Sequence, residues 1–141
     1  MMDLSRPWDT ATIESRETAT PEQLLVFDRD ALLDHLGGDV DLMGQILERY
    51  LDCLADYLDL LPGALFAADV QQVRIKAHLI KGAAINIGAL QVSEAARQLE
   101  MLARGGKLDG AVGLLNHLMS SVDTFRRELS ERYGASQRPN Q

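Results

Sequence analysis

The sequence is short of cysteine, aromatic residues, positive charge and long apolar runs, and each shortage excludes a class of protein. Cys53 is the only cysteine among 141 residues, which excludes an internal disulfide and a cysteine metal cluster. A reduced, cytoplasmic setting is therefore expected. No apolar run approaches the roughly 20 residues of a membrane helix. The N-terminus lacks the charged start and continuous apolar stretch of a signal peptide, so neither a membrane span nor secretion is predicted.

The charge and the apolar composition narrow the choice further. The chain carries 14 basic and 21 acidic residues, a formal net charge of −7, which makes it a poor candidate for binding nucleic acid or an anionic membrane. Apolar residues make up 46% of the chain and aromatics only 5%, and the apolar set is mostly leucine and alanine. These are strong helix formers, so packed helices are favoured over a β-sandwich. The length fits one domain.

The two ends of the chain differ from its middle. Residues 1–23 have no sustained apolar period and are predicted to be a flexible N-terminal arm, with Trp8 either a packing anchor or exposed. Residues 134–141 are polar and are predicted to be a frayed C-terminal tail. The domain is therefore expected to span residues 24–133.

Helical periodicity fills that middle region. Aspartates stand where N-caps are expected, at positions 28, 39, 69 and 109, and Pro62-Gly63 is expected to end or interrupt the second helix. The predicted helices span residues 28–36, 39–61 with a further turn at 64–68, 69–87, 90–103 and 109–129. Short loops between long helices imply antiparallel neighbours. The predicted fold is all-α: an antiparallel up-down four-helix bundle with a short leading helix.

The third helix contains a histidine that points away from its apolar stripe. At 100° per residue, His78 lies about 140° and Gly82 about 180° from the direction of the stripe. His78 is therefore not predicted to be a core histidine. The stripe itself consists of Val73, Ala77, Ile80, Ala84 and Ile87.

Gly82 and its neighbours suggest that this outward face meets another protein. A glycine inside a helix costs about 1 kcal/mol relative to alanine, so its presence calls for a reason. One reason is close approach of a partner to His78, and the other is tight packing between helices of this chain. Outward apolar side chains favour the partner, since solvent gains nothing from them. The predicted docking residues are Gln71, Arg74, Ile75, Leu79 and Ile85.

Lys81 places a positive charge beside the imidazole. Residues three and four apart are neighbours on a helix surface, so His78, Lys81 and Gly82 are expected to cluster. The ammonium could stabilise phosphate oxygens. The cluster predicts a site that moves a phosphoryl group on and off a nitrogen.

The pattern resembles the histidine-containing phosphotransfer (HPt) domain family. Residues 77–84 read Ala-His-Leu-Ile-Lys-Gly-Ala-Ala, followed by Gly88-Ala89 and Leu99-Glu100. Residues 27–33 and the Gly-Gly-Asp at 37–39 also resemble the opening helix and loop of the family. The resemblance covers about residues 25–130.

The resemblance implies a phosphocarrier of a multistep two-component phosphorelay. His78 would take a phosphoryl group, through Nε2, from a receiver aspartyl-phosphate or a histidine kinase, including a hybrid kinase, and pass it to a receiver aspartate. The neutral imidazole suits this role because its ordinary pKa is near 6.5. No cofactor is expected in this chain, because the receiver would bring the Mg²⁺. No ATP site is expected either, so the chain would not be an enzyme in its own right.

Glu100 is a further candidate, 22 residues after His78 on the next helix. Some relatives carry at this position a glutamine that hydrogen-bonds the imidazole. A carboxylate could accept from Nδ1–H and leave Nε2 free. A solvated glutamate or an interhelical salt bridge is the alternative.

Two other functions remain open from the sequence, and several other side chains were considered as possible sites. The first rival is a non-phosphorylated adaptor or inhibitor that docks a receiver or kinase, and the second is a purely structural bundle. His35 and His117 lack partners that would indicate a site and are predicted to be structural or solvated, and Cys53 is predicted to be a packed or half-exposed thiol. The acidic residues at 52, 56 and 59 are predicted to form a solvated face, and no metal site is predicted.

Overall fold

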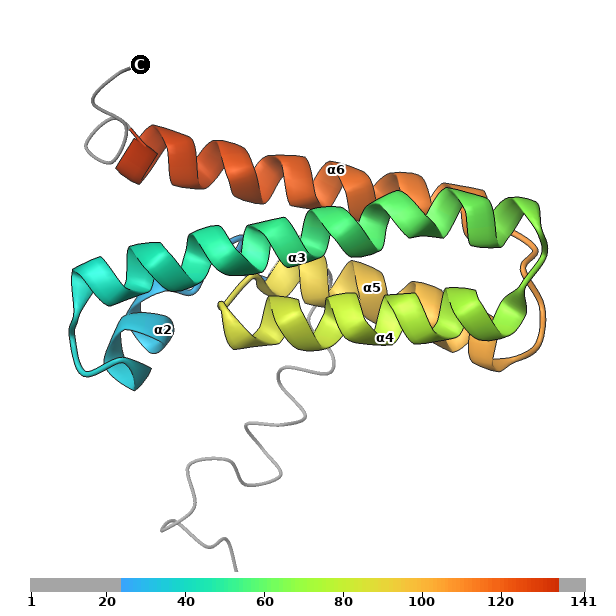
Figure 1. The fold of residues 1–141 in the computed structure, drawn as a ribbon, viewed down its shortest axis with the longest axis horizontal. Helices are drawn as coiled ribbons and strands as arrows, with labels where there is room; N and C mark the ends of the chain where they lie inside the picture. The colour runs from blue at the N-terminus through green and yellow to red at the C-terminus, as the bar shows by residue number, and fades with distance from the viewer. Residues whose placement is uncertain (1–23, 135–141) are drawn as a thin grey trace, which may run out of the picture.

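The protein is an antiparallel helical bundle. The computed structural model describes residues 24–134, and within them no strand occurs (Figure 1). The elements are α2 (Arg29–His35), α3 (Val40–Phe66), α4 (Val70–Asn86), α5 (Leu90–Arg104), α6 (Ala111–Leu129) and a π-helical turn, η2 (Ser130–Gly134). The predicted all-α class is confirmed. The predicted arm (1–23, with Trp8) and tail residues 135–141 lie outside the described part, while Gly134 belongs to η2.

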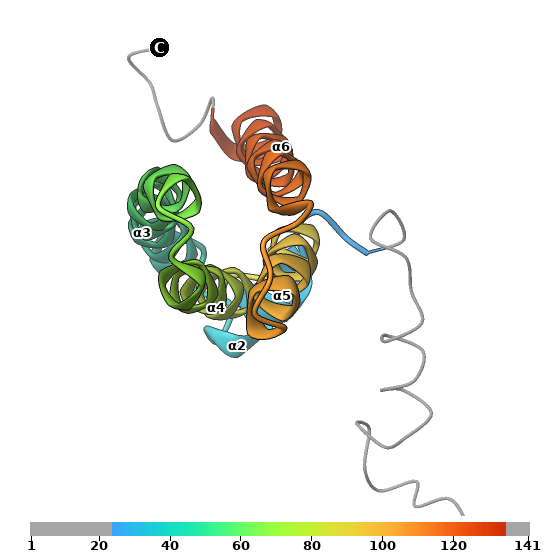
Figure 2. The same ribbon diagram turned by 90° about the vertical axis from the view of Figure 1, so that its right-hand side faces the viewer.

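The four long helices lie at the corners of a square when viewed end-on, in the order α3, α4, α5, α6 (Figure 2). The short helix α2 lies outside this square. Helix α4 packs against both α3 and α5, its two neighbours in the square. No helix within residues 24–134 is both long enough and apolar enough to cross a membrane.

Aspartates start three of the helices, as predicted. Asp28, Asp39 and Asp69 each accept a hydrogen bond from the backbone N–H three residues later, at 3.2, 3.0 and 3.1 Å. These bonds satisfy N–H groups that the first turn of a helix leaves without partners. The prediction that Asp109 caps α6 is wrong. The chain turns through a left-handed Gly110 (φ 83°), so Gly110 is the N-cap and no side chain caps this helix.

Helix α3 is longer than predicted. It was expected to end near Leu61, but it continues past Pro62 to Phe66 without a break. A proline inside a helix removes one N–H bond. Here the final turn is still closed by bonds from Ala67 N–H to Gly63 O (3.0 Å) and from Asp69 N–H to Ala64 O (2.9 Å). The lost bond lies so close to the C-terminus that it does not end the helix.

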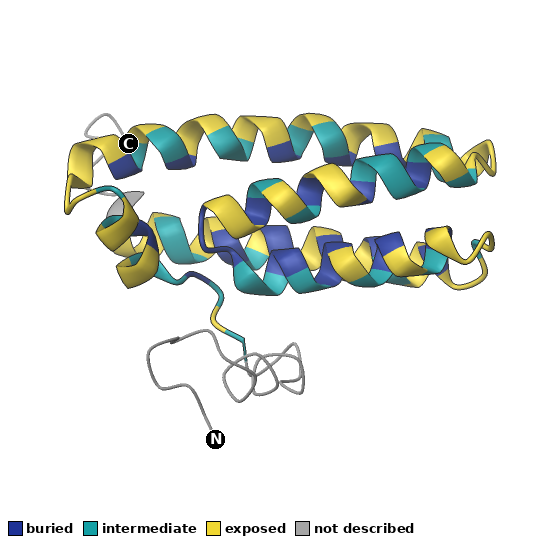
Figure 3. Ribbon diagram, turned by 90° about the horizontal axis from the view of Figure 1, so that it is seen from below, coloured by how far each residue is buried: buried dark blue, intermediate teal, exposed yellow. Residues whose placement is uncertain are grey.

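The core lies between the four long helices, and the buried positions of each face it (Figure 3). All five stripe residues of α4 predicted to be buried have no exposed surface. Phe27 packs edge-on against Phe125, with ring centroids 5.5 Å apart, and so connects the segment before α2 to α6. Leu58 and Glu100 are among the buried residues that the sequence did not place in the core.

The segment before α2 is held against the turn between α4 and α5. Asp28 N–H donates to Gly88 O at 2.8 Å, and Gln91 Nε2 donates to Leu24 O at 2.8 Å. Gly88 has a positive φ (73°), and a Cβ there would lie 2.8 Å from Asp28 O. Only glycine allows both this turn and this approach. The turn that ends α4, the helix of His78, is thereby fixed.

Candidate functional site

His78 lies on the outer surface of α4. Its neighbours along the chain, Ala77 and Ile80, are completely buried, which fixes the rotation of the helix. With these residues in the core, the His78 side chain is 60% exposed. The predicted position of His78 off the core stripe is therefore confirmed.

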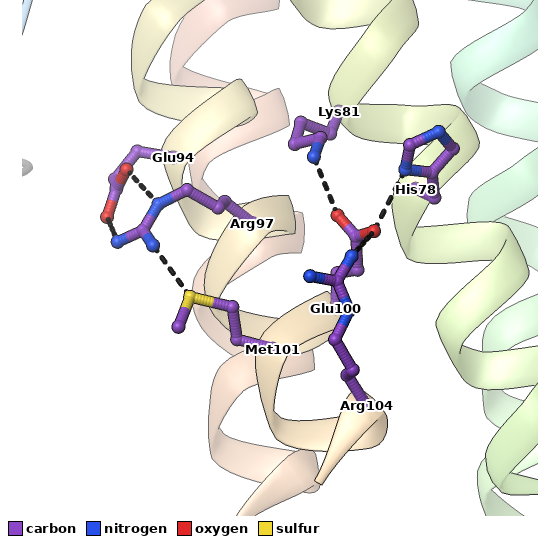
Figure 4. A network of polar contacts seen from close by, with 7 residues as sticks. All are labelled: His78, Lys81, Glu94, Arg97, Glu100, Met101 and Arg104. Carbon is purple, nitrogen blue, oxygen red and sulfur yellow. Dashed lines mark hydrogen bonds and ion pairs between the residues drawn. The ribbon is translucent and has the colours of Figure 1, made fainter.

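Glu100 of α5 joins His78 and Lys81 in one polar cluster (Figure 4). Glu100 Oε2 lies 2.9 Å from His78 Nδ1, and Glu100 Oε1 lies 2.8 Å from Lys81 Nζ. The glutamate side chain is only 2% exposed. Glu100 is therefore not a solvated glutamate. It contacts the imidazole and also forms an interhelical salt bridge.

Arg104 is a fourth member of this cluster that the sequence reasoning missed. Its Nη2 donates to Glu100 Oε2 at 2.8 Å, the same oxygen that contacts His78. Arg104 follows Glu100 by four residues on α5, a spacing that brings side chains together on a helix. That spacing was visible in the sequence, but it gains meaning only once Glu100 is known to contact His78.

The surroundings of Glu100 keep its carboxylate ionised. Burial is the largest single influence and raises the pKa of the Glu100 carboxyl. The hydrogen bonds and charges of Lys81 and His78 together outweigh burial, so the pKa lies below its ordinary value. One negative charge thus contacts two permanent positive charges, those of Lys81 and Arg104. The cluster carries a net charge of +1 when the imidazole is neutral.

An ionised carboxylate fixes the protonation of the imidazole. It can only accept hydrogen bonds, so the contact with Glu100 requires the proton on Nδ1. In the neutral ring, the lone pair is then on Nε2. Among the described residues nothing hydrogen-bonds Nε2, and this nitrogen points away from Glu100 in Figure 4. His78 can therefore act as a nucleophile toward an incoming group.

A groove between α3 and α4 lies on the other side of His78. Tyr50 and Tyr57 are half-buried and line it, and Tyr50 OH accepts from Asn86 Nδ2 at 3.4 Å. The Cys53 thiol is exposed there. The lining consists of Arg49, Tyr50, Cys53, Tyr57, His78, Leu79, Gly82, Ala83 and Asn86.

The predicted docking residues are unevenly exposed. Leu79 and Ile85 keep 38% and 55% of their surface exposed, and Gln71 is also exposed. Arg74 and Ile75 are half-buried, and Arg74 Nε donates to Gln71 Oε1 at 3.4 Å. Leu79 and Ile85 are thus exposed apolar side chains on the same helix as His78.

Gly82 is exposed and lines the groove, with empty space around it. A Cβ built on Gly82 meets no atom within 4 Å outside its own stretch of helix. Tight packing between helices of this chain therefore does not explain the glycine. Of the two explanations open from the sequence, approach by a partner is the one that this geometry favours.

The remaining histidines lie away from this cluster. His35 is exposed on α2 and His117 is exposed on α6. Within residues 24–134, no group of three or more histidine, cysteine, aspartate or glutamate side chains could hold a metal ion.

Comparison with known proteins agrees with this geometry. The Hpt domain model matches residues 45–131, more than half of the chain. The solved structure of histidine-containing phosphotransfer protein B (HptB) from Pseudomonas aeruginosa PAO1 is similar, with a TM-score of 0.69 and 27% sequence identity, over 77% of this chain and 96% of that one. No curated protein matches significantly. On the family match, which covers the helix of His78 and its neighbours on both sides, the chain belongs to the Hpt domain family and is a histidine phosphotransfer protein of a phosphorelay.

Proposed function

We propose that His78 receives a phosphoryl group on Nε2 from a receiver aspartyl-phosphate or from a histidine kinase, and passes it to a receiver aspartate. The observation that carries this proposal is the orientation of the ring. Nδ1 contacts the buried Glu100, and the side chain is nevertheless 60% exposed. A nucleophilic nitrogen on an exposed side chain can enter the active site of a partner, which a buried nitrogen cannot.

The transfer itself exchanges one phosphorus bond for another. The Nε2 lone pair attacks phosphorus, and the bond from phosphorus to the aspartate oxygen breaks, leaving a carboxylate on the donor. The ring then carries a positive charge, with its proton still on Nδ1. The reverse sequence delivers the group to the next aspartate.

The charges around His78 favour a phosphoryl group. Lys81 and Arg104 together exceed the single charge of Glu100, so the cluster attracts an anion. Lys81 lies on the same helix face as His78, where its ammonium can stabilise the transferring oxygens. In this proposal Glu100 orients the ring and Lys81 supplies electrostatic stabilisation.

The partner in this proposal docks over Gly82. A receiver domain, or the receiver or phosphotransfer part of a hybrid histidine kinase, would cover Leu79, Ile85 and Gln71, with Arg74 and Ile75 at its margin. The absence of a side chain at Gly82 would allow its backbone to come close to Nε2.

In this proposal, the chain supplies only the phosphoryl-accepting histidine and the side chains that orient and stabilise it. The Mg²⁺ of the reaction is assigned to the receiver domain, and ATP is used by a kinase elsewhere in the relay. A cytoplasmic location is part of the proposal, in keeping with the free, exposed thiol of Cys53.

The deciding experiment uses a receiver domain charged with labelled phosphate. After incubation, this chain is expected to carry a label that is labile in acid and stable in base, as a phosphohistidine is. His78→Gln should carry none. Label that persists in His78→Gln would overturn the assignment of His78. A wild-type chain that binds the receiver but never becomes labelled would point instead to the adaptor.

A further inference from the structure

The contact between Glu100 and His78 has a consequence for the phosphorylated protein as well as for the free one. An ionised carboxylate accepts hydrogen bonds and donates none, whereas an amide at the same place can do either. Glu100 therefore contacts the ring favourably only while Nδ1 holds a proton. That requirement remains when Nε2 carries a phosphoryl group.

The proton on Nδ1 decides how easily the phosphoryl group leaves. On departure the Nε2–P bond breaks, its electron pair stays on Nε2, and phosphorus bonds to an aspartate oxygen or to water. If Nδ1 is protonated, the leaving group is a neutral imidazole. If it is not, the leaving group is the imidazolate anion, a far stronger base and a far poorer leaving group.

We infer that the charge of Glu100 keeps phosphorylated His78 in its protonated, readily discharged form, so that this residue sets how long the carrier holds its phosphoryl group. Glu100 acts here as a positioning residue, since it touches the ring and not the phosphorus. The inference rests on the proposed function of His78. It predicts a carrier that passes its group on quickly and stores it poorly at neutral pH.

Arg104 limits this effect, because it competes for the same oxygen. Its Nη2 and His78 Nδ1 lie 2.8 and 2.9 Å from Glu100 Oε2. Each donor weakens the oxygen as an acceptor for the other. Lys81 uses the second oxygen, Oε1, so the carboxylate has no contact-free oxygen. Removing Arg104 should therefore leave Glu100 a stronger acceptor for the Nδ1 proton.

Other groups that titrate or carry charge face His78 from the helices on both sides. Because all of these groups influence the ring, the test compares variants of this protein with one another and not with free histidine. On α4 and α5 they are Arg74, Lys81, Glu100 and Arg104, and on α3 they are Arg49, Tyr50, Cys53 and Tyr57.

The test measures loss of phosphate from the isolated chain between pH 5 and pH 8. Phosphoramidate serves as the donor, and ³¹P NMR follows the signal of the phosphohistidine. At pH 8, Glu100→Gln is expected to lose its phosphoryl group about tenfold more slowly than the wild type, because charge-assisted hydrogen bonds are roughly twice as strong as neutral ones. The two rates should converge at pH 5, where the ring is protonated in both proteins.

Two further variants make the test independent of any folding defect in Glu100→Gln. Arg104→Gln alters a side chain that is 64% exposed and should speed the loss at pH 8. Arg97→Gln is the matched control, because Arg97 pairs with Glu94 elsewhere on α5 and does not contact His78 (Figure 4). Its rate should equal that of the wild type.

The protonation of the ring can also be observed directly. At pH 8, the ¹⁵N shift of Nδ1 in the phosphorylated wild type should lie closer to that of a protonated nitrogen than the shift in Glu100→Gln, and the shift in Arg104→Gln should lie closer still. Equal loss rates in the wild type and Glu100→Gln, or slower loss in Arg104→Gln, would overturn the inference while leaving His78 as the carrier. If the wild type accepted phosphate neither from phosphoramidate nor from a charged receiver, the proposed function itself would be overturned.

Discussion

The two flanks of His78 differ in almost every physical respect. Toward α5, the space is filled by Glu100, Lys81 and Arg104, with three contacts of 2.8 to 2.9 Å around one buried carboxylate. Toward α3, a groove is open, and its lining is largely apolar or aromatic. The first flank can set the protonation of the imidazole, and the second can receive a partner. We therefore expect α5 to support the chemistry of His78 and α3 to take part in docking.

The largest effect on the open flank is expected from Leu79→Asp. A charge placed in an apolar contact should cost about 2 kcal/mol of binding to the receiver, which corresponds to roughly a thirtyfold loss of affinity. Affinity can be measured by calorimetry with an uncharged receiver. Val112→Asp, at an exposed apolar position on α6, is the control and should bind normally. Equal losses in both variants would contradict the division between flanks.

Gly82→Ala should separate stability from transfer. Because a Cβ at Gly82 meets nothing in this chain, the variant should gain about 1 kcal/mol of folding free energy. Phosphotransfer from a charged receiver should nevertheless fall by about tenfold, since the added methyl group keeps the partner from its productive position.

Gly113→Ala is the matched control for this variant. Gly113 is also a helical glycine with nothing within 4 Å of its Cβ position, but it lies on α6. It should gain stability without slowing transfer. Normal transfer in Gly82→Ala would mean that no partner approaches this part of α4 closely.

On the filled flank, the stability conferred by Glu100 should depend on pH. The pKa of Glu100 is lowered in the folded protein, so its ionised form stabilises the fold above the unfolded-state value of about 4.5. This contribution is lost as the pH falls through the folded-state pKa. The difference in unfolding free energy between the wild type and Glu100→Gln should shrink as the pH falls from 5 toward 3. Urea titrations at these pH values measure it.

The smallest effect is expected from Tyr50→Phe in the groove. The hydrogen bond from Asn86 Nδ2 to Tyr50 OH is long, at 3.4 Å, and its donor is exposed. Its loss should change the unfolding free energy by less than about 0.5 kcal/mol. A change in unfolding free energy above about 1 kcal/mol would show that the hydrogen bond between Asn86 and Tyr50 stabilises the fold more than its length implies.

The sequence predicted the features that depend on periodicity and local chemistry. The stripe of α4 and the aspartate caps of α2, α3 and α4 follow from spacing along a single helix, and all were found as predicted. The position of His78 off the stripe follows for the same reason. The resemblance to the family added the functional meaning of these residues.

The features that the sequence could not predict depend on contacts across helices. Burial of Glu100 requires the distance between α4 and α5, and the role of Arg104 depends in turn on Glu100. The groove beside His78 depends on how far Tyr50 and Tyr57 of α3 lie from α4. Pro62 was expected to end or interrupt α3, but it lies inside the helix, near its C-terminus. Asp109 was expected to cap α6, but the left-handed Gly110 takes the N-cap position.

The cluster around His78 is built from one pair of consecutive helices, since His78 and Lys81 lie on α4 and Glu100 and Arg104 on α5. These side chains meet across a sequence separation of at most 26 residues. Short-range contacts of this kind require little loop closure and form early in folding. We therefore expect the α4–α5 hairpin to be the most slowly exchanging unit in hydrogen exchange, with the carrier site assembled before α3 and α6 close the bundle.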